Sequence, residues 1–550
     1  MFNLAFYCLF VPILLTPLGC LLKKNSNINF IILSSQLIYG IILISFISLI
    51  INFFSPLNIM INTLIMVLPL LIFFKKLKYF FSVIFLKFLF FNAIIIFLLT
   101  AYSKVYTPDA ALYHLPYIDI LNNEKIVIGL SNLHFRFGHI SIIQYFSASL
   151  NNIIFQNNGI IISLAVVGSA VIINFLSHIF NYFKNQKYNF HFFYLFSIII
   201  FIAYKMNRYS EYGNDAPTHF LFFFLLSEII LSLNNKIKYD ISNNFILSIF
   251  ILLNKITMAF ALVLPFVFLK KKEIINTIKI KKFYFGFFFL FFWIIKNILI
   301  SGCLVYPMAK LCITNLEWTD IEQVNYVAAE NEAWTKDYPN YKNTNNISHL
   351  EYTKNFNWLS TWSKVHLKKI LEILLPYIAF ILLIYSYLYL NQKNKRKIFI
   401  NKINYKYLLL ILLMLGFTFI WFLKVPMYRY GYSYFISLIS LIFAFFCIKL
   451  NLDLKKSNQF FKFFIMFCLI IFITKNSYRI IKYNNLFSNN NVIPKIILNK
   501  KSNFEKVNLE EFFYYESVKE CGYGYSPCTH YRNLNLKAKK LYNYKIISKN

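Results

Sequence analysis

Long runs of apolar residues alternate with short polar segments along the whole chain. A helix needs about 20 such residues to cross the hydrocarbon of a bilayer. The run 241–269 is too long for one crossing and is interrupted at Asn254-Lys255, so we expect two half-length helices that turn back there. Other candidate spans lie at 2–22, 28–54, 56–74, 79–101, 159–180, 283–303, 367–390 and 432–449, with shorter ones at 190–204, 217–234, 407–423 and 460–474. The pattern predicts an all-α polytopic membrane protein with about 14 transmembrane helices.

The composition excludes two other classes of protein. Of the 550 residues, 58% are hydrophobic and 14% are charged, whereas soluble domains carry about 25% charged residues and disordered chains have low hydrophobicity. The net charge of +34 would indicate nucleic-acid binding in a soluble protein. Here the basic residues lie in short loops between apolar runs, so we expect contact with membrane lipids and no nucleic-acid partner.

The positions of Lys and Arg predict the orientation of the chain. One set of loops is strongly basic, and the other carries about as many acidic as basic residues. The basic set lies at 23–27, 75–78, 181–189, 235–240, 270–282, 391–406 and 449–462, and the balanced set at 102–158, 205–216, 304–366 and 424–431. Basic loops stay in the cytoplasm, so we place the protein in a bacterial inner membrane with the balanced loops and both termini in the periplasm.

Six regions follow from this plan. Because Lys23-Lys24 follow the first apolar run and no basic residue precedes it, we expect a retained span in place of a cleaved signal peptide. The regions are the N-terminal spans 1–101, the first outer loop 102–158, the central spans 159–303, the large outer loop 304–366, the C-terminal spans 367–474 and an outward tail domain 475–550.

The cysteines divide into two groups. Four lie in apolar runs, where thiols usually pack as small hydrophobic groups. Cys521 and Cys528 lie in the polar tail, in the segment Cys-Gly-Tyr-Gly-Tyr-Ser-Pro-Cys, and we expect them to form a disulfide in an oxidising compartment; the alternative is two free thiols. Cys303 and Cys312 could form a second pair.

The first outer loop carries the densest group of polar and aromatic residues. Thr107-Pro108-Asp109 is a helix-start signal, and a helix from this point would place Asp109 and Tyr113 on one face. Asp109 would then lie at the mouth of a membrane cavity, unless its only role is to cap this helix. The short apolar stretch 140–156 is interpreted as a helix lying in the membrane interface, before the crossing 159–180.

This order of a span, an outer loop that opens with an acid, an interfacial helix and a second span resembles the GT-C glycosyltransferases. The resemblance implies a polyprenyl-phosphate sugar as donor and Asp109 as the catalytic carboxylate. Asp215, in Tyr-Gly-Asn-Asp-Ala-Pro just before a span, matches their second acid, and Leu252-Leu253-Asn254-Lys255 resembles their break between two short helices. More narrowly, Asp-x-x-x-Tyr-His followed by Asn-Leu-His-x-Arg-x-Gly resembles an uncharacterised group of bacterial multi-pass proteins.

Two departures from the GT-C pattern bear on the mechanism. Three additional spans precede the one before Asp109, and Ala110-Ala111 follow it where an acidic pair would bind a metal. The three histidines of the first outer loop match no compact zinc motif. We therefore expect no metal site and no cofactor.

Sugar transfer from a lipid phosphate requires specific groups. A carboxylate takes the proton of the acceptor hydroxyl as it attacks the anomeric carbon with inversion, and cations hold the leaving phosphate. We expect Asp109 to be the base and Asp215 to orient the acceptor or the base. The residues expected to bind substrate are Tyr113, His114, Asn132, His134, Arg136, Lys296 and Arg429, with Arg208 as a further outward cation.

The large outer loop 304–366 is expected to cover this site and to meet the acceptor, which is a glycan, a lipid or a protein. It combines seven acids with aromatic residues such as Trp318 and Trp334, and aromatic faces beside carboxylates suit a sugar. Three other functions stay open: an oligosaccharide polymerase or ligase that uses a diphosphate-linked glycan, a transporter or lipid flippase, and a non-catalytic scaffold.

Overall fold

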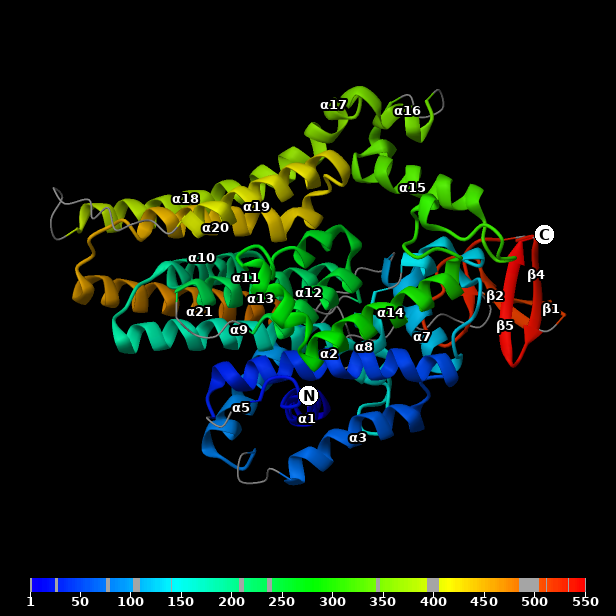
Figure 1. The fold of residues 1–550 in the computed structure, drawn as a ribbon, viewed down its shortest axis with the longest axis horizontal. Coiled ribbons are helices and arrows are strands. Elements are labelled where there is room, and N and C mark those ends of the chain that lie inside the picture. Colours follow the sequence, from blue (N-terminus) through cyan, green and yellow to red (C-terminus); the bar gives the residue numbers. More distant parts are fainter. Residues whose placement is uncertain are drawn as a thin grey trace.

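The computed structural model of the chain is mostly helical, with a small β domain at its C-terminal end (Figure 1). It describes residues 2–24, 28–75, 80–101, 109–139, 141–206, 212–234, 240–342, 347–392, 405–483, 504–510, 512–532 and 534–549. Within these residues, nine helices are long and apolar enough to cross a membrane, and four shorter helices are also apolar. The membrane class is confirmed, whereas the expected count of about 14 spans is not established by these helices.

The N-terminal helices pack closely around a buried central helix. This helix is α2 (Phe30–Phe54), and its neighbours are α1 (Phe2–Gly19), α3 (Ile59–Lys75), α5 (Val83–Thr100) and α9 (Gly159–Asn185). A Cβ atom at Gly40 would lie 2.1 Å from the carbonyl oxygen of Leu15. Only glycine therefore permits α1 and α2 to approach this closely.

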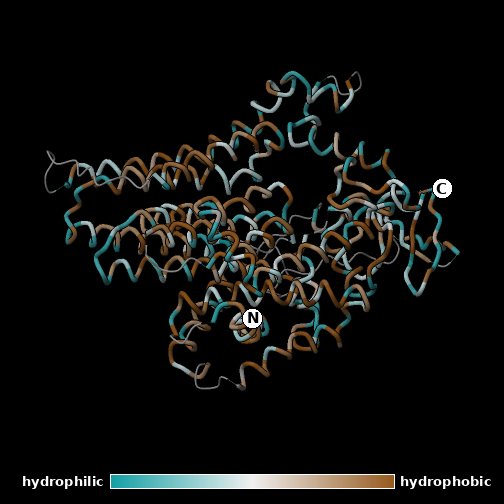
Figure 2. The backbone as a smooth tube through the Cα atoms, in the orientation of Figure 1, coloured by the Kyte–Doolittle hydropathy of each residue, from teal (hydrophilic) through white to brown (hydrophobic). Residues whose placement is uncertain are grey.

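The remaining membrane helices form two layers, with α18, α19 and α20 above α9 to α12 and α21 in the view of Figure 1. Their bounds are α10 Phe190–Lys205, α11 Asp215–Asn234, α12 Ile241–Asn254, α14 Lys281–Ser301, α18 Lys368–Leu390, α19 Tyr405–Lys424, α20 Tyr432–Cys447 and α21 Leu454–Tyr483. Figure 2 shows these helices as predominantly hydrophobic, with hydrophilic residues concentrated at their ends and in the C-terminal domain.

The run 241–269 differs from the expectation of two half-length α-helices. Its first half is α12, but the second half begins with the 3₁₀ segment η5 (Ile256–Leu262) and continues as turns. The short helix α13 (Lys271–Ile278) follows in a basic loop. The reversal itself therefore lies at Asn254-Lys255, where the interruption of the apolar pattern indicated it.

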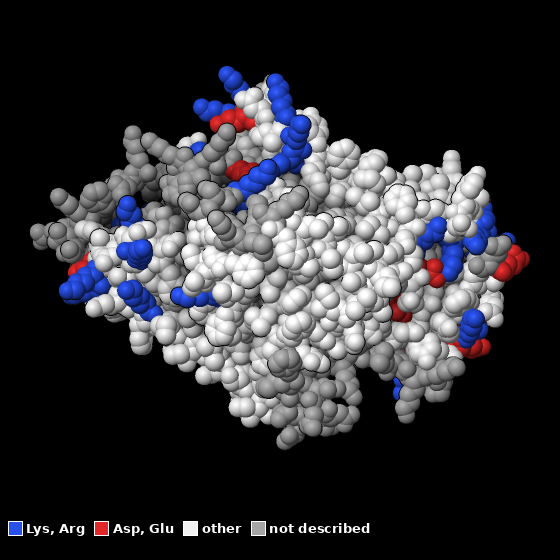
Figure 3. All heavy atoms as spheres, turned by 90° about the horizontal axis from the view of Figure 1, so that it is seen from below, with Lys and Arg blue, Asp and Glu red and all other residues white. Residues whose placement is uncertain are grey.

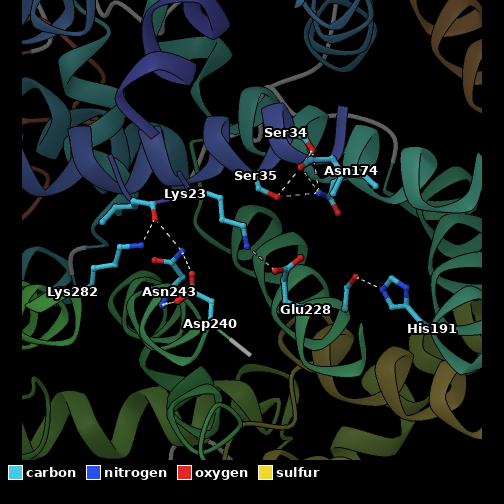
Figure 4. Close-up of polar contacts among 12 residues, drawn as sticks. Lys23, Ser34, Ser35, Asn174, His191, Glu228, Asp240, Asn243 and Lys282 are labelled. Atoms are coloured by element: carbon cyan, nitrogen blue, oxygen red, sulfur yellow. Dashed lines mark hydrogen bonds and ion pairs between the residues drawn. The ribbon is translucent and has the colours of Figure 1, made fainter. Parts of the chain in front are cut away.

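Charged residues gather at the ends of the helical bundle. Figure 3 shows a broad face without charged side chains between charged regions, as expected for a surface in contact with lipid tails. At one end, Lys23 Nζ lies 3.3 Å from Glu228 Oε2, and the side chains of Asn243 and Lys282 both donate to the carbonyl oxygen of Leu22 (Figure 4). These contacts join the segment around Lys23 to residues of α11 and α12 and to the basic loop 270–282, and the sequence assigns both this segment and this loop to the cytoplasm.

The opposite end holds the first outer loop. It contains the π-helix η1 (Ala110–His114), α7 (Leu115–Asn123), η2 (Leu130–Asn132), η3 (Phe135–His139) and α8 (Ile143–Ser149). The structure differs from the expected interfacial helix 140–156 in two respects. α8 is shorter, and all its residues are buried inside the protein. It is covered because it packs between α2, α7 and α9.

The C-terminal tail folds as β structure, which the all-α expectation did not include. One sheet consists of β1 (Phe504–Leu509), β2 (Phe512–Ser517) and β3 (Cys528–Thr529), with β2 antiparallel to β1 and parallel to β3. A second sheet pairs β4 (Leu536–Leu541) with β5 (Tyr544–Lys549). The amide of Ile128 donates to the carbonyl oxygen of Lys545 at 2.9 Å, so the tail domain packs directly against the first outer loop.

The large outer loop forms α15 (Ile321–Thr335), α16 (His349–Thr353) and α17 (Leu359–Trp362), which project from the bundle above the tail domain (Figure 1). Trp318 is half-buried, and its indole N–H donates to the carbonyl oxygen of Ile298 at 2.8 Å. Trp334 is 49% exposed. The loop is held at one end by the disulfide between Cys303 and Cys312.

Candidate functional site

Arg429 brings together the two carboxylates that the sequence singled out. Its Nη2 lies 3.5 Å from Asp109 Oδ2, and its Nε lies 3.4 Å from Asp215 Oδ2. Asp109 directly precedes η1, Asp215 is the first residue of α11, and Arg429 lies in the 3₁₀ turn before α20. Three segments separated by hundreds of residues therefore meet because their helices begin at the same end of the bundle.

Asp109 does not act as a helix cap. Its backbone already has helical angles, and its side chain makes no capping hydrogen bond to η1. The alternative interpretation of Asp109 as a cap is therefore wrong. Its carboxylate is 32% exposed and faces Arg429, so it is accessible to a ligand.

Lys255 is a member of this cluster that the sequence analysis assigned only to a helix break. Its ammonium group donates to Asp215 and lies 3.2 Å from the centre of the Tyr430 ring. A lysine inside an apolar run is costly unless it is paired, and this was the signal that could have identified it. The side-chain oxygen of Asn254 accepts hydrogen bonds from Ser141 Oγ and the Ile143 amide, so the break is tied to the start of α8.

His219 positions the turn that carries Arg429. It lies one turn after Asp215 in α11, with Nε2 2.8 Å from the carbonyl oxygen of Arg429 and Nδ1 2.6 Å from Ser433 Oγ. A carbonyl oxygen can only accept, so Nε2 carries the proton and Nδ1 accepts from the serine. Only its spacing of four residues from Asp215 pointed to His219 in the sequence.

His114 occupies a small pocket beside the carboxylates. The Ser141 amide donates to Gln144 Oε1 at 3.1 Å, so Gln144 Nε2 is the atom that faces His114 Nδ1 at 3.0 Å. Nδ1 therefore accepts, and His114 carries its proton on Nε2, where it can donate to a ligand. The residues that line the pocket are Tyr113, His114, Tyr117, Arg136, His139, Ser141, Gln144 and Asn214.

Burial controls the charge state of His114. Loss of hydration lowers the pKa of its imidazole to about 4, although the negative charges of Asp109 and Asp215 act in the opposite direction. The positive charges of Arg136 and Arg429 lower this pKa further. His114 is thus a neutral hydrogen-bond donor near pH 7 and contributes no charge to the site.

Arg136 supplies a cation without an ionic partner. Its guanidinium carbon lies 5.4 Å from the centre of the Tyr113 ring and 4.9 Å from that of Phe135. Among the described residues, no carboxylate lies within ion-pair distance of it. Its charge is available to an anionic ligand of the pocket.

Three other residues expected to bind substrate lie elsewhere. Lys296 is completely buried in α14, with its Nζ 3.4 Å from the centre of the Trp293 ring. The Asn132 side-chain amide donates to two backbone carbonyl oxygens, those of Trp318 and Ile547. Lys296 and Asn132 therefore contribute to packing, and neither reaches the pocket.

His134 also has a structural environment. The Arg136 amide donates to its Nδ1 at 3.1 Å, so its Nε2 donates to His530 Nδ1 at 3.2 Å. Burial lowers the pKa of His134, which keeps it neutral. It joins the first outer loop to the tail domain. Arg208, the further cation named from the sequence, lies outside the described residues.

No group of three metal-ligating side chains occurs in the part of the chain that the structure describes. The site therefore consists of two carboxylates, three cations and a neutral imidazole. Such a set can hold an anion and activate a hydroxyl group.

Comparisons with known proteins place the chain by family alone. No curated protein and no solved structure matches it. A family model described as a domain of unknown function, DUF8201, matches residues 1–436. This range contains Asp109, Asp215, Lys255 and Arg429 and excludes the β domain. The chain belongs to the DUF8201 family.

Proposed function

We propose that this protein is a membrane glycosyltransferase that moves a sugar from a polyprenyl-phosphate donor to an acceptor on the outer side of a bacterial inner membrane. The observation that carries the proposal is the bridge from Arg429 to both Asp109 and Asp215 at one end of the helical bundle. Carboxylates beside a guanidinium are the groups that glycosyl transfer from a phosphate requires. The resemblance to GT-C enzymes supports the same reaction.

The charge of the site favours a monophosphate donor. Asp109 and Asp215 together balance Lys255 and Arg429, and Arg136 then leaves one positive charge. A sugar linked to a lipid through one phosphate carries a single negative charge, which this site would neutralise. A diphosphate-linked donor, the substrate of a polymerase or ligase, would leave one charge uncompensated.

Each member of the cluster has a role in the reaction. Asp109, which is open to solvent, is the general base that takes the proton of the acceptor hydroxyl. The hydroxyl oxygen attacks the anomeric carbon from the side opposite the phosphate, so the configuration inverts. Arg429 and Arg136 hold the phosphate oxygens as negative charge develops on them. His114 Nε2 donates to the sugar or to a phosphate oxygen.

Asp215 and Lys255 have a supporting role. Lys255 is buried and donates to Asp215, and Asp215 in turn contacts Arg429. This chain of contacts fixes the guanidinium between the two acids. The acceptor enters from the side of the loop 304–366 and is a glycan, a lipid or a protein.

Reconstitution tests the proposal. Purified protein in liposomes is supplied with polyprenyl-phosphate pentoses and hexoses carrying radiolabelled sugar, together with cell-envelope acceptors, and label transfer is measured. We expect transfer from one monophosphate donor, and at least about 1,000-fold slower transfer by Asp109→Asn, which cannot take the proton. Glu351→Gln, an exposed acid of α16, is the matched control and should keep wild-type activity.

Three results would contradict the proposal. Full activity of Asp109→Asn would remove the base from the mechanism. Transfer from diphosphate-linked oligosaccharides alone would instead identify a polymerase or ligase, and movement of labelled lipid across the bilayer without transfer would identify a flippase.

A further inference from the structure

The tail domain contacts the helices that follow Asp109 through the loop of residues 521–528, which is closed by the disulfide between Cys521 and Cys528. The family model ends before this domain, and none of the roles above uses it. We propose that this loop, called the clamp loop here, is a positioning element that holds η1 and α7 so that Asp109 faces Arg429. The inference rests on the proposed function for its effect on turnover, but its effect on the helix can be measured separately.

The first contact satisfies a carbonyl group that the helix cannot satisfy itself. In the π-helix η1, the Leu115 amide donates to the carbonyl oxygen of Ala110, five residues earlier. The corresponding donor for the carbonyl of Ala111 would be residue 116, which is proline and has no amide hydrogen. The Gly522 amide of the clamp loop donates to this oxygen at 2.8 Å.

The second contact inserts a tyrosine between two helices. Tyr523 is buried, and its hydroxyl donates to Asn122 Oδ1 at 3.0 Å and accepts from Asn151 Nδ2 at 2.8 Å. Asn122 belongs to α7, and Asn151 follows α8. One side chain of the tail therefore fixes the spacing of the two helices that flank the pocket.

The third contact is made by a buried carboxyl group. Asp119 of α7 is 2% exposed and accepts from the Gly524 amide at 3.0 Å and from Asn123 Nδ2 at 2.9 Å. Buried carboxyl groups are costly unless they are bonded in this way. Three consecutive residues of the clamp loop thus bind to η1, to the gap between α7 and α8, and to α7.

The local sequence explains why the loop can make these contacts. Gly522 and Gly524 have φ angles of +70° and +107°, which glycine adopts without strain and other residues rarely adopt. The disulfide joins the two ends of the segment and restricts the conformations open to it when it is not bound to the helices. The loop is therefore presented to η1 and α7 in its binding shape.

Loss of the clamp should affect turnover more than donor binding. Arg429 and Arg136, which hold the phosphate, belong to other elements, so these contacts with the donor would persist, while Asp109 and His114 of η1 would gain freedom. A displacement of a catalytic group by about 1 Å can cost about 100-fold in rate. We expect kcat to fall about 10- to 100-fold with less than about a threefold change in KM for the donor.

Hydrogen–deuterium exchange of the full-length protein in nanodiscs tests the structural part directly. The variant Cys521→Ser/Cys528→Ser should exchange the amides of residues 110–123 at least about 10-fold faster than wild type. The matched control is Cys303→Ser/Cys312→Ser, which removes the other disulfide and should leave these amides unchanged. Tyr523→Phe, which keeps the ring and removes both hydroxyl contacts, should give an intermediate increase even if the cysteine variant misfolds.

A compensating variant separates positioning from general stability. Pro116→Ala restores an amide hydrogen within the helix, which gives the carbonyl of Ala111 a local donor. Combined with the loss of the 521–528 disulfide, it should restore part of the protection of residues 110–123. Unchanged exchange in both the cysteine and the Tyr523 variants would overturn the clamp, whether or not transfer activity is found. Faster exchange with an unchanged ratio of kcat to KM would overturn its link to catalysis.

Discussion

Arg429 provides the sharpest test of the site, because one side chain contacts both carboxylates through different nitrogens. Its Nη2 faces Asp109 at 3.5 Å and its Nε faces Asp215 at 3.4 Å. A lysine carries one nitrogen at the end of a flexible chain and cannot reproduce this fork. Arg429→Lys therefore keeps the charge of the site and removes one of the two contacts.

The expected loss can be worked from these contacts. These contacts are ion pairs, and the Arg429 side chain is 39% exposed, so solvent screens them and each contributes at most about 1 kcal/mol. A loss of about 1 kcal/mol corresponds to roughly a fivefold decrease in kcat/KM. Arg429→Gln also removes the charge that neutralises the two acids, and should cost more than about 100-fold.

The assay is sugar transfer by reconstituted protein at several donor concentrations, so that kcat and KM are separated. Arg532→Lys, which replaces an exposed arginine of the tail domain, is the control for the substitution type. We expect wild-type activity for that control and an order of wild type, Arg429→Lys and Arg429→Gln for the site. Equal activities of the two Arg429 variants would show that the fork is not used, and the reasoning from geometry would be refuted.

Three other outcomes follow from the structure. Lys255→Gln leaves Asp215 without its buried partner, so it should lower the thermal midpoint and should reduce kcat/KM by at least about tenfold; unchanged values in a melting and transfer assay would contradict this. Burial lowers the pKa of His114 from 6.5 to about 4, so as the pH falls the unfolded chain binds a proton before the folded protein does. The free energy of unfolding should therefore decrease as the pH drops from about 6.5 to about 4. His114→Gln should flatten this dependence in melting curves. Burial raises the pKa of Asp119 from 3.8 to about 7, so here the folded protein holds the proton longer, and stability should fall as the pH rises from about 4 to about 7 by at most about 4 kcal/mol. In wild type, the hydrogen-exchange rate of the Gly524 amide should change over the same pH range. In Asp119→Asn this pH dependence should be absent.

Hydropathy, local spacing and the family resemblance together predicted the membrane class, and of the nine site residues expected from the sequence the structure brings six together. Asp109, Tyr113 and His114 lie on one short helix, so their proximity follows from a local pattern. Asp215 and Arg429 stood out because they are charged residues at the starts of apolar runs, where a charge is costly unless it is paired or faces a cavity. Their meeting point depends on how the helices pack, and no local pattern carries that information.

The residues that the sequence misplaced are buried among other parts of the protein, away from the pocket. Asn132 and His134 lie in the same polar segment as Arg136, and their residue types alone do not distinguish a ligand contact from a bond to a distant carbonyl or histidine. Lys296 is buried inside its helix, where its ammonium group lies against the Trp293 ring. The β structure of the tail was missed because its strands are at most six residues long and rich in charged residues, so they carry little hydrophobic periodicity.

A structure of the Asp109→Asn variant in nanodiscs with a polyprenyl-phosphate sugar tests the central claim most directly. The amide cannot take the hydroxyl proton, so the donor should remain intact in the site. The account predicts phosphate density between the guanidinium groups of Arg429 and Arg136, with the anomeric carbon facing residue 109. Donor density at any other place on the protein, with this pocket empty, would contradict it.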